Sequence, residues 1–334
     1  MTGAVATLQS LPVSSMPVLG TWITRQLVFN GVVTGLVTGL LAMGIVLVYR
    51  STRVINFAVG NLGLVGASLL VLMTINYDFP LWVAMIVALL VGTAFGAIVE
   101  LTVVRRLFDS PRVILLVATV GVAQLAQAVI AAYPDIDSGG ARYPAVITKT
   151  WDDVAGVRVV GPKLTILIVV PIVAVALGWL LNRTTFGKAV SASADNTDLS
   201  RLSGVNPKIV STFVWTIAGF LSTLSIILLS GDSGSISGLS NLGPLTLGKA
   251  MVAAVIAGMV SFPRAVAAGV FLGVAEAIFR FNALNPGAPG FLQETSIIDF
   301  VFFLLVAGAV YLQSRRSGDD GVFAFAPKVR PVPE

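Results

Sequence analysis

The stretch "GLLAMGIVLVYRSTRVINFAVGNLGLVGA" (39–67) decides the fold, because it places two arginines and an asparagine between two long apolar runs. A helix needs about 20 apolar residues to cross the hydrocarbon core of a bilayer. The runs before Arg50 and from Asn56 onward are each that long. Arginines in short loops mark the cytoplasmic ends of such helices. The stretch therefore predicts a tight cytoplasmic hairpin, anchored by Arg50 and Arg53, between two membrane spans.

The composition of the whole chain also predicts a membrane protein. Of its 334 residues, 56% are hydrophobic and 11% are charged, and the mean hydropathy is +0.93. A soluble domain carries about a quarter charged residues, so lipid must cover most of this chain. The absence of Cys and His excludes disulfides, thiol catalysis and Cys or His metal sites. We expect no cofactor, no metal and no nucleic acid, and we interpret the net charge of +5 as membrane orientation.

Apolar runs of spanning length recur along the chain and predict an all-α fold, a polytopic helical bundle in the lipid bilayer. The expected spans are 27–49, 56–75, 81–104, 112–132, 164–181, 209–230, 264–281 and 296–313. A further run, 248–260, covers only about 20 Å at the helical rise and is followed by Pro263. Proline disfavours helix in the residue before it, so we expect one broken or re-entrant helix and eight or nine spans.

The basic residues predict the orientation. With an external N-terminus and a crossing at 248–260, fourteen of the 21 basic residues lie in cytoplasmic segments, as the positive-inside rule requires. Segment 1–26 is then extracytoplasmic, without the features of a signal peptide, and 133–163 is an external loop. Residues 27–313 form the membrane domain, and 314–334 form a cytoplasmic tail.

Residue types within the predicted spans point to helix packing rather than to chemistry. Small residues that allow close helix contact in lipid recur at Gly31, Gly35, Gly39, Gly92, Gly96, Gly269 and Gly273. Intramembrane carboxylates would indicate ion coupling, but Glu100, Glu276 and Asp299 lie near the ends of their spans, and we interpret them as structural. Gln124 and Gln127 either bridge helices or face a pore. No paired carboxylates or Ser/Lys dyad offers a mechanism for a membrane enzyme.

The predicted cytoplasmic connection 182–208 is long and polar. Between Gly187 and Gly204 it contains neither Gly nor Pro. A weak apolar face is formed by Ala189, Ala192, Leu199 and Leu202. Gly204 suits the residue after a helix, and Pro207 stops its continuation. Since connections in membrane bundles are usually shorter, the segment is either an ordinary connector or a short surface helix that docks on a cytosolic partner.

Three colinear blocks carry a family resemblance: the opening stretch, "TTFGKAVSASADNTDLSRLSGVN" (184–206) and "LGKAMVAAVIAGMVSFPRAVAAGVFLGVAEAIF" (247–279). Together they resemble the branched-chain amino acid ABC-transporter permeases of the LivH type. The resemblance extends from about residue 27 to residue 313. It implies a permease subunit, not an enzyme, of an importer for branched-chain amino acids or similar small polar solutes in a bacterial inner membrane. It also implies a second permease subunit, two cytosolic ATPase subunits and an extracytoplasmic substrate-binding protein.

The resemblance also suggests site residues. The suggested substrate path consists of Asn56, Phe57, Gly60 and Gln124, where Asn56 either lines the path or only caps a helix. The contact with the ATPase is assigned to Gly187, Lys188, Ala189, Ala192, Leu199, Leu202 and Gly204.

The chain departs from the family at three positions. Val59 and Asn61 stand where His and Glu are frequent, and Ser191 stands where an Arg is common. These departures leave the substrate open, because relatives with this fold move urea, amides or other solutes. Two alternatives from other classes are an ion-coupled secondary transporter of a small solute and a membrane scaffold subunit.

Overall fold

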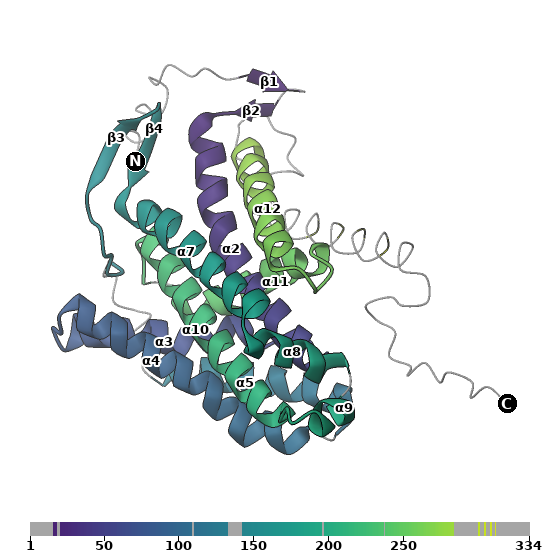
Figure 1. The fold of residues 1–334 in the computed structure, drawn as a ribbon. Coiled ribbons are helices and arrows are strands. Elements are labelled where there is room, and N and C mark those ends of the chain that lie inside the picture. Colours follow the sequence, from purple (N-terminus) through teal and green to yellow (C-terminus); the bar gives the residue numbers. More distant parts are fainter. Residues whose placement is uncertain are drawn as a thin grey trace.

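The computed structural model describes residues 16–18, 21–108, 110–132, 142–195, 197–236 and 238–283, together with positions 300, 304, 308 and 311. Within these residues the chain is a bundle with eight helices long and apolar enough to cross a membrane (Figure 1). The polytopic helical bundle predicted from the sequence is therefore confirmed. Apart from the four single positions, the predicted span 296–313 and the tail 314–334 lie outside the described residues.

The candidate spans follow one another along the chain, with longer connections between α5 and α7 and between α7 and α10. They are α2 (Arg25–Thr52), α3 (Val59–Val71) with the π-helix η1 (Leu72–Asn76), α4 (Leu81–Val99) with η2 (Glu100–Val104) and η3 (Arg105–Leu107), α5 (Arg112–Ala131), α7 (Gly161–Arg183), α10 (Pro207–Ser233), α11 (Leu239–Ile256) and α12 (Phe262–Ala283). Two shorter helices, α8 (Thr185–Asp195) and α9 (Thr197–Leu202), connect α7 to α10.

Two small antiparallel sheets, which the all-α prediction did not include, lie outside the helices. Strand β1 (Met16–Val18) pairs with β2 (Thr21–Ile23), and β3 (Thr150–Val154) pairs with β4 (Val157–Val160). Both sheets lie at the end of the bundle opposite to α8 and α9 (Figure 1). The hairpin of β3 and β4 and the helices α8 and α9 therefore lie at opposite ends of the bundle.

Helices α2 and α12 approach each other so closely that only glycine fits between them. A Cβ added to Gly35 would lie 2.6 Å from the carbonyl oxygen of Gly269, and one added to Gly273 would lie 2.4 Å from that of Gly31. Real Cβ contacts are not this short, so the glycine repeat allows backbone-to-backbone packing in lipid. This pair of repeats therefore serves packing within the chain.

The predicted break near Pro263 is confirmed. Helix α11 ends at Ile256 and α12 begins at Phe262, and between them Gly258 (φ 73°) and Met259 (φ 56°) adopt left-handed conformations. Pro263 is the second residue of α12, where its missing N–H group breaks no helical hydrogen bond. However, only residues 248–256 of the predicted run 248–260 are helical, and they form the second half of α11. Its 18 residues correspond to about 27 Å at 1.5 Å per residue, close to the thickness of the hydrocarbon core.

One side chain of the predicted external loop is buried in the bundle. Tyr143 is 2% exposed, and its hydroxyl donates to the carbonyl oxygen of Ala67 in α3 at 3.2 Å. Burial raises the pKa of the Tyr143 phenol above its usual range, because the charged form would lose its hydration. Tyr143 therefore remains a neutral donor that fixes the loop to the outer part of α3.

Candidate functional site

The link between α2 and α3 contains Asn56, which is only 1% exposed. Its side-chain oxygen accepts a hydrogen bond from the Ala58 backbone N–H at 2.8 Å. Asn56 thus pairs the backbone N–H of Ala58, the residue just before the first turn of α3. Its side-chain nitrogen, Nδ2, is buried without a hydrogen-bond partner among the described residues. A buried amide donor left unpaired is destabilising, so this nitrogen is available for a ligand or water.

The start of α3 is enclosed by α5 and α11. The backbone N–H of Phe57 donates to Thr119 Oγ1 at 3.2 Å, and Asn61 Nδ2 donates to the Ala123 carbonyl oxygen at 2.9 Å. The other amide atom, Asn61 Oδ1, is buried without a partner among the described residues. A Cβ on Gly243 of α11 would lie 2.1 Å from this oxygen. Asn61 is therefore a candidate site residue that the sequence-based selection missed, although a polar residue inside an apolar run is a usable signal.

The remaining two predicted path residues differ in their surroundings. Gly60 lies beside Asn61, and a Cβ there would be 2.3 Å from the Gly243 carbonyl oxygen, so Gly60 permits the close contact of α3 with α11. The side chain of Gln124 is on the exposed side of α5. Its neighbour in the same helix, Gln127, donates to the Ser240 carbonyl oxygen at 3.3 Å and so bridges α5 and α11. Asn56, Phe57 and Gly60 thus lie together at the start of α3, and Gln124 follows Ala123, whose carbonyl oxygen accepts the hydrogen bond from Asn61.

Helix α8 has one face on the bundle and one face free. Val190 and Ser193 are buried, and a Cβ on Gly187 would lie only 1.8 Å from the Leu181 carbonyl oxygen of α7. Lys188 and Ala192 are exposed on the other face. The close approach at Gly187 is therefore made to the chain's own α7, and the free surface belongs to Lys188 and Ala192, with Ala189 half-buried between the two faces.

Helix α9 adds two exposed apolar side chains next to α8. Its apolar side chains Leu199 and Leu202 are 60% and 86% exposed. The helix ends at Gly204 (φ 81°), and the N–H of Val205 donates to the Ser200 carbonyl oxygen at 2.9 Å. This is the glycine-dependent helix end expected from the sequence. Two exposed leucines on a short polar segment are unusual for a connector and typical of a contact surface.

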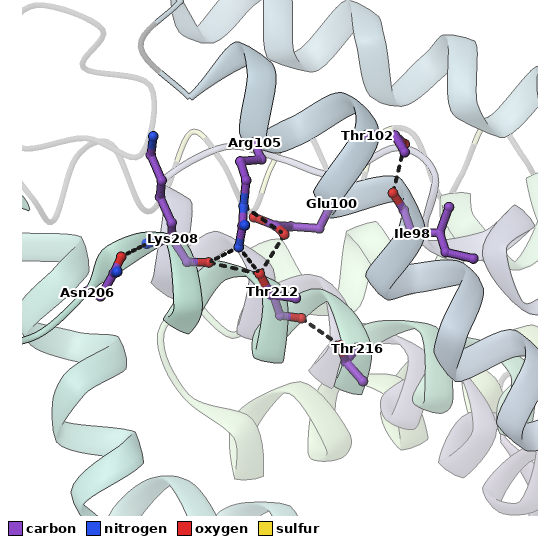
Figure 2. Close-up of polar contacts among 8 residues, drawn as sticks. All are labelled: Ile98, Glu100, Thr102, Arg105, Asn206, Lys208, Thr212 and Thr216. Carbon is purple, nitrogen blue, oxygen red and sulfur yellow. Dashed lines mark hydrogen bonds and ion pairs between the residues drawn. The ribbon is translucent and has the colours of Figure 1, made fainter.

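A buried carboxylate fixes the start of α10, immediately after this segment (Figure 2). Glu100 of η2 is fully buried, and its Oε2 accepts a hydrogen bond from Thr212 Oγ1 at 2.6 Å. The Nε of Arg105 lies 3.7 Å from the same oxygen. Nη2 of Arg105 also donates to Thr212 Oγ1 at 2.8 Å and to the Lys208 carbonyl oxygen at 3.4 Å. The inner end of α4 is thereby tied to the first turns of α10.

Other carboxylates in the described spans are also close to cations. Glu276 Oε1 lies 2.5 Å from Lys249 Nζ of α11 and 3.1 Å from Arg280 Nε. Asp232 lies 4.0 Å from Lys163. Each of these carboxylates thus has a cation beside it, as ionisable residues within membrane spans usually do. Asp299 lies outside the described residues.

Comparison with known proteins identifies relatives over most of the chain. BraD of Pseudomonas aeruginosa, a high-affinity branched-chain amino acid transport system permease protein, is 29% identical over 266 residues, covering 76% of this chain and 85% of BraD. LivH of Escherichia coli K12, with the same description, is 27% identical over 267 residues, covering 76% and 85%. A LivH protein of Methanocaldococcus jannaschii is 25% identical over 269 residues, covering 79% and 84%. No solved structure matches the chain.

Residues 27–310 match the family model described as branched-chain amino acid transport system / permease component. This match covers the helices and the segment α8–α9 in one continuous range. Relatives of this kind are transport permeases of ABC importers and not enzymes, and they act with ATPase and binding-protein partners. Together with the eight apolar helices, the match shows that this multi-pass membrane protein belongs to the branched-chain amino acid transport permease family.

Proposed function

We propose that the chain is one of two permease subunits in an ATP-driven importer in the bacterial inner membrane. Two cytosolic ATPases supply the energy, and an extracytoplasmic binding protein delivers a branched-chain amino acid or a similar small polar solute. Residues 27–313 form the membrane domain. Segment 133–163 faces the outside, and 182–208 faces the cytoplasm. The observation that carries the proposal is the continuous family match over residues 27–310.

The exposed face of α8 and α9 is proposed as the ATPase contact. Lys188, Ala192, Leu199 and Leu202 form the surface, and Gly204 ends it. Gly187 and Ala189 contribute from the side of the bundle by letting α8 lie close to α7. A protein partner suits this surface, because a partner that covers the exposed leucines removes their apolar surface from water and so stabilises the complex.

A bulky side chain on this surface should disconnect the ATPase. We expect Ala192→Trp to insert into the membrane normally, to abolish ATP-dependent uptake of radiolabelled leucine, and to weaken co-purification of the ATPase, because the indole ring would hold the partner away from α8. The measurement uses proteoliposomes that contain the complete transporter and its binding protein.

The matched control is Ala176→Trp, which changes an exposed alanine of α7 and should transport normally. Normal ATPase binding and uptake by Ala192→Trp would show that α8 is not the contact. If uptake persists without any ATPase and collapses with the proton gradient, the secondary-transporter alternative is correct.

The substrate path is proposed along Asn56, Phe57, Gly60 and Gln124, with Asn61 added. Asn56 Nδ2 supplies a free donor and Asn61 Oδ1 a free acceptor, and both are neutral. Such a pair suits a small polar solute, because a solute with hydrogen-bonding groups can pair both when α3 and α11 separate. The exposed Gln124 offers a further amide from α5, the helix that contacts the start of α3.

Changes at Asn56 and Gln124 should have separable effects. We expect Asn56→Ala to lower the free energy of unfolding by about 1–3 kcal/mol, because it leaves the buried Ala58 N–H unpaired, and also to reduce uptake. Gln124→Ala should change stability by less than about 0.5 kcal/mol, as exposed positions usually do, yet reduce uptake. Thermal unfolding in detergent and leucine uptake provide the two measurements. Wild-type uptake by Gln124→Ala would remove that residue from the path.

A further inference from the structure

Arg50, in the last turn of α2, contacts two other helices with one side chain. Its Nη2 donates a hydrogen bond to Ser191 Oγ of α8 at 3.2 Å. Its guanidinium carbon lies 5.0 Å from the ring centre of Phe262, the first residue of α12. A planar guanidinium can donate hydrogen bonds in its plane while its face covers an aromatic ring. Arg50 therefore links α8 to the start of α12.

The start of α12 adjoins the place where the helical hairpin can bend. Between Ile256 and Phe262 the backbone leaves the helical conformation, with positive φ at Gly258 and Met259. A few non-helical residues of this kind can absorb a change in the angle between two packed helices. Phe262 is 3% exposed, so its ring is held firmly in the bundle. A displacement of this ring would move the first turn of α12 with it.

The position of α8 allows a force on its exposed face to reach the contact between Ser191 and Arg50. Its free face carries Lys188 and Ala192, whereas Val190 and Ser193 are buried against the bundle. Ser191 lies between these faces and is half-buried. A partner that moves α8 as a rigid helix therefore moves Ser191 relative to α2. The polar and aromatic contacts of Arg50 oppose separation of the three elements.

We propose that Arg50 is a positioning residue that transmits the movement of α8 to the start of α12 during the ATP cycle. The inference rests on the proposed function, because it requires α8 to be the ATPase contact. Arg50 does not touch the ATPase or the substrate in this arrangement. Its loss should therefore uncouple the ATPase from the membrane helices while leaving the assembled complex intact.

The test measures the accessibility of the break between α11 and α12. Val260, 59% exposed within the break, is replaced by Val260→Cys in this chain, which has no native cysteine. In the complete transporter, ATP with vanadate should change the rate of maleimide labelling at this position. Arg50→Met should reduce that change and the leucine uptake per ATP by about tenfold, within the usual range of coupling between sites, with ATPase binding unchanged. Arg50→Lys, which keeps a cation over Phe262 and one donor for Ser191, should recover a substantial part.

Several results would overturn the inference. One is that ATP with vanadate still changes the labelling rate when Arg50→Met is present. Another is that ATP with vanadate does not change the labelling rate in the Val260→Cys protein that keeps Arg50. Loss of ATPase binding in Arg50→Met would mean that Arg50 only holds α8 in place for docking. If Arg50→Met does not accumulate, the same measurements are made with Ser191→Ala and Phe262→Leu. A labelling change and an uptake per ATP like those of the wild type in both variants would reject the proposal. Failure of the proposed function is distinguishable, because Ala192→Trp would then bind the ATPase and transport normally.

Discussion

Gly269→Val should prevent stable folding of the membrane bundle. A Cβ at Gly269 would lie 2.5 Å from both Cα and N of Gly39 and 2.8 Å from the Gly35 carbonyl oxygen. These neighbours are backbone atoms of α2, so no side-chain rotation can relieve the overlap, and α2 and α12 must move apart. Overpacking with movable side chains costs about 1–3 kcal/mol. We expect a larger loss here, seen as low yield of monodisperse protein from membranes.

The matched control is Gly121→Val in α5. It makes the same chemical change in another candidate span, but a Cβ at Gly121 has no atom within 4 Å. We expect this variant to accumulate and to unfold at nearly the wild-type temperature. If both variants behave alike, then the α2–α12 contact does not determine the stability of the bundle.

Arg105→Ala should destabilise the protein more than any loss of an exposed arginine. It removes the cation beside Glu100, whose carboxylate is fully buried. Removal of one partner from a fully buried ion pair costs about 3–5 kcal/mol. Because the Arg105 side chain is 36% exposed, we expect a smaller loss here, of about 1–3 kcal/mol. Thr212 alone would then pair the carboxylate, and the junction between α4 and α10 would loosen. Thermal unfolding in detergent measures the loss.

The second substitution Glu100→Gln should restore much of the stability of Arg105→Ala, because a neutral amide can still accept the hydrogen bond from Thr212. As a control, Arg106→Ala removes an adjacent arginine that is exposed and should change stability by less than about 0.5 kcal/mol. Equal effects of Arg105→Ala and Arg106→Ala, or no recovery in the double variant, would contradict a structural ion pair at Glu100.

Local sequence signals predicted much of the fold. The order of the spans follows from runs of apolar residues, and the turn after α9 follows from Gly204, whose positive φ glycine adopts at low cost. The start of α11 was missed. Asn241, Gly243 and Pro244 lower helix propensity there, yet these residues are helical, and the close contact with Gly60 and Asn61 of α3 accompanies the longer helix.

Asn61 and Gly187 show why the candidate site itself was only partly predictable. The partners of Asn61 are Ala123 and Gly243, which are 62 and 182 residues away in sequence. Periodicity does not specify such contacts. Gly187 was assigned to the ATPase contact, but its close neighbour is Leu181 of the same chain, because α8 turns back against the end of α7. Composition identifies a position that needs a small residue, and packing decides what lies beside it.

The sequence by itself determined that lipid surrounds the chain, the order of the described spans and their number to within one helix. It also determined the break before α12 and the family. Each of these depends on local hydropathy, local backbone preference or a colinear motif. The tertiary structure alone decided which buried polar atoms are paired, which face of α8 is free, that Tyr143 enters the bundle, and that Arg50 joins α8 to α12. These features depend on contacts between residues distant in the chain, and such contacts exist only after the helices have packed.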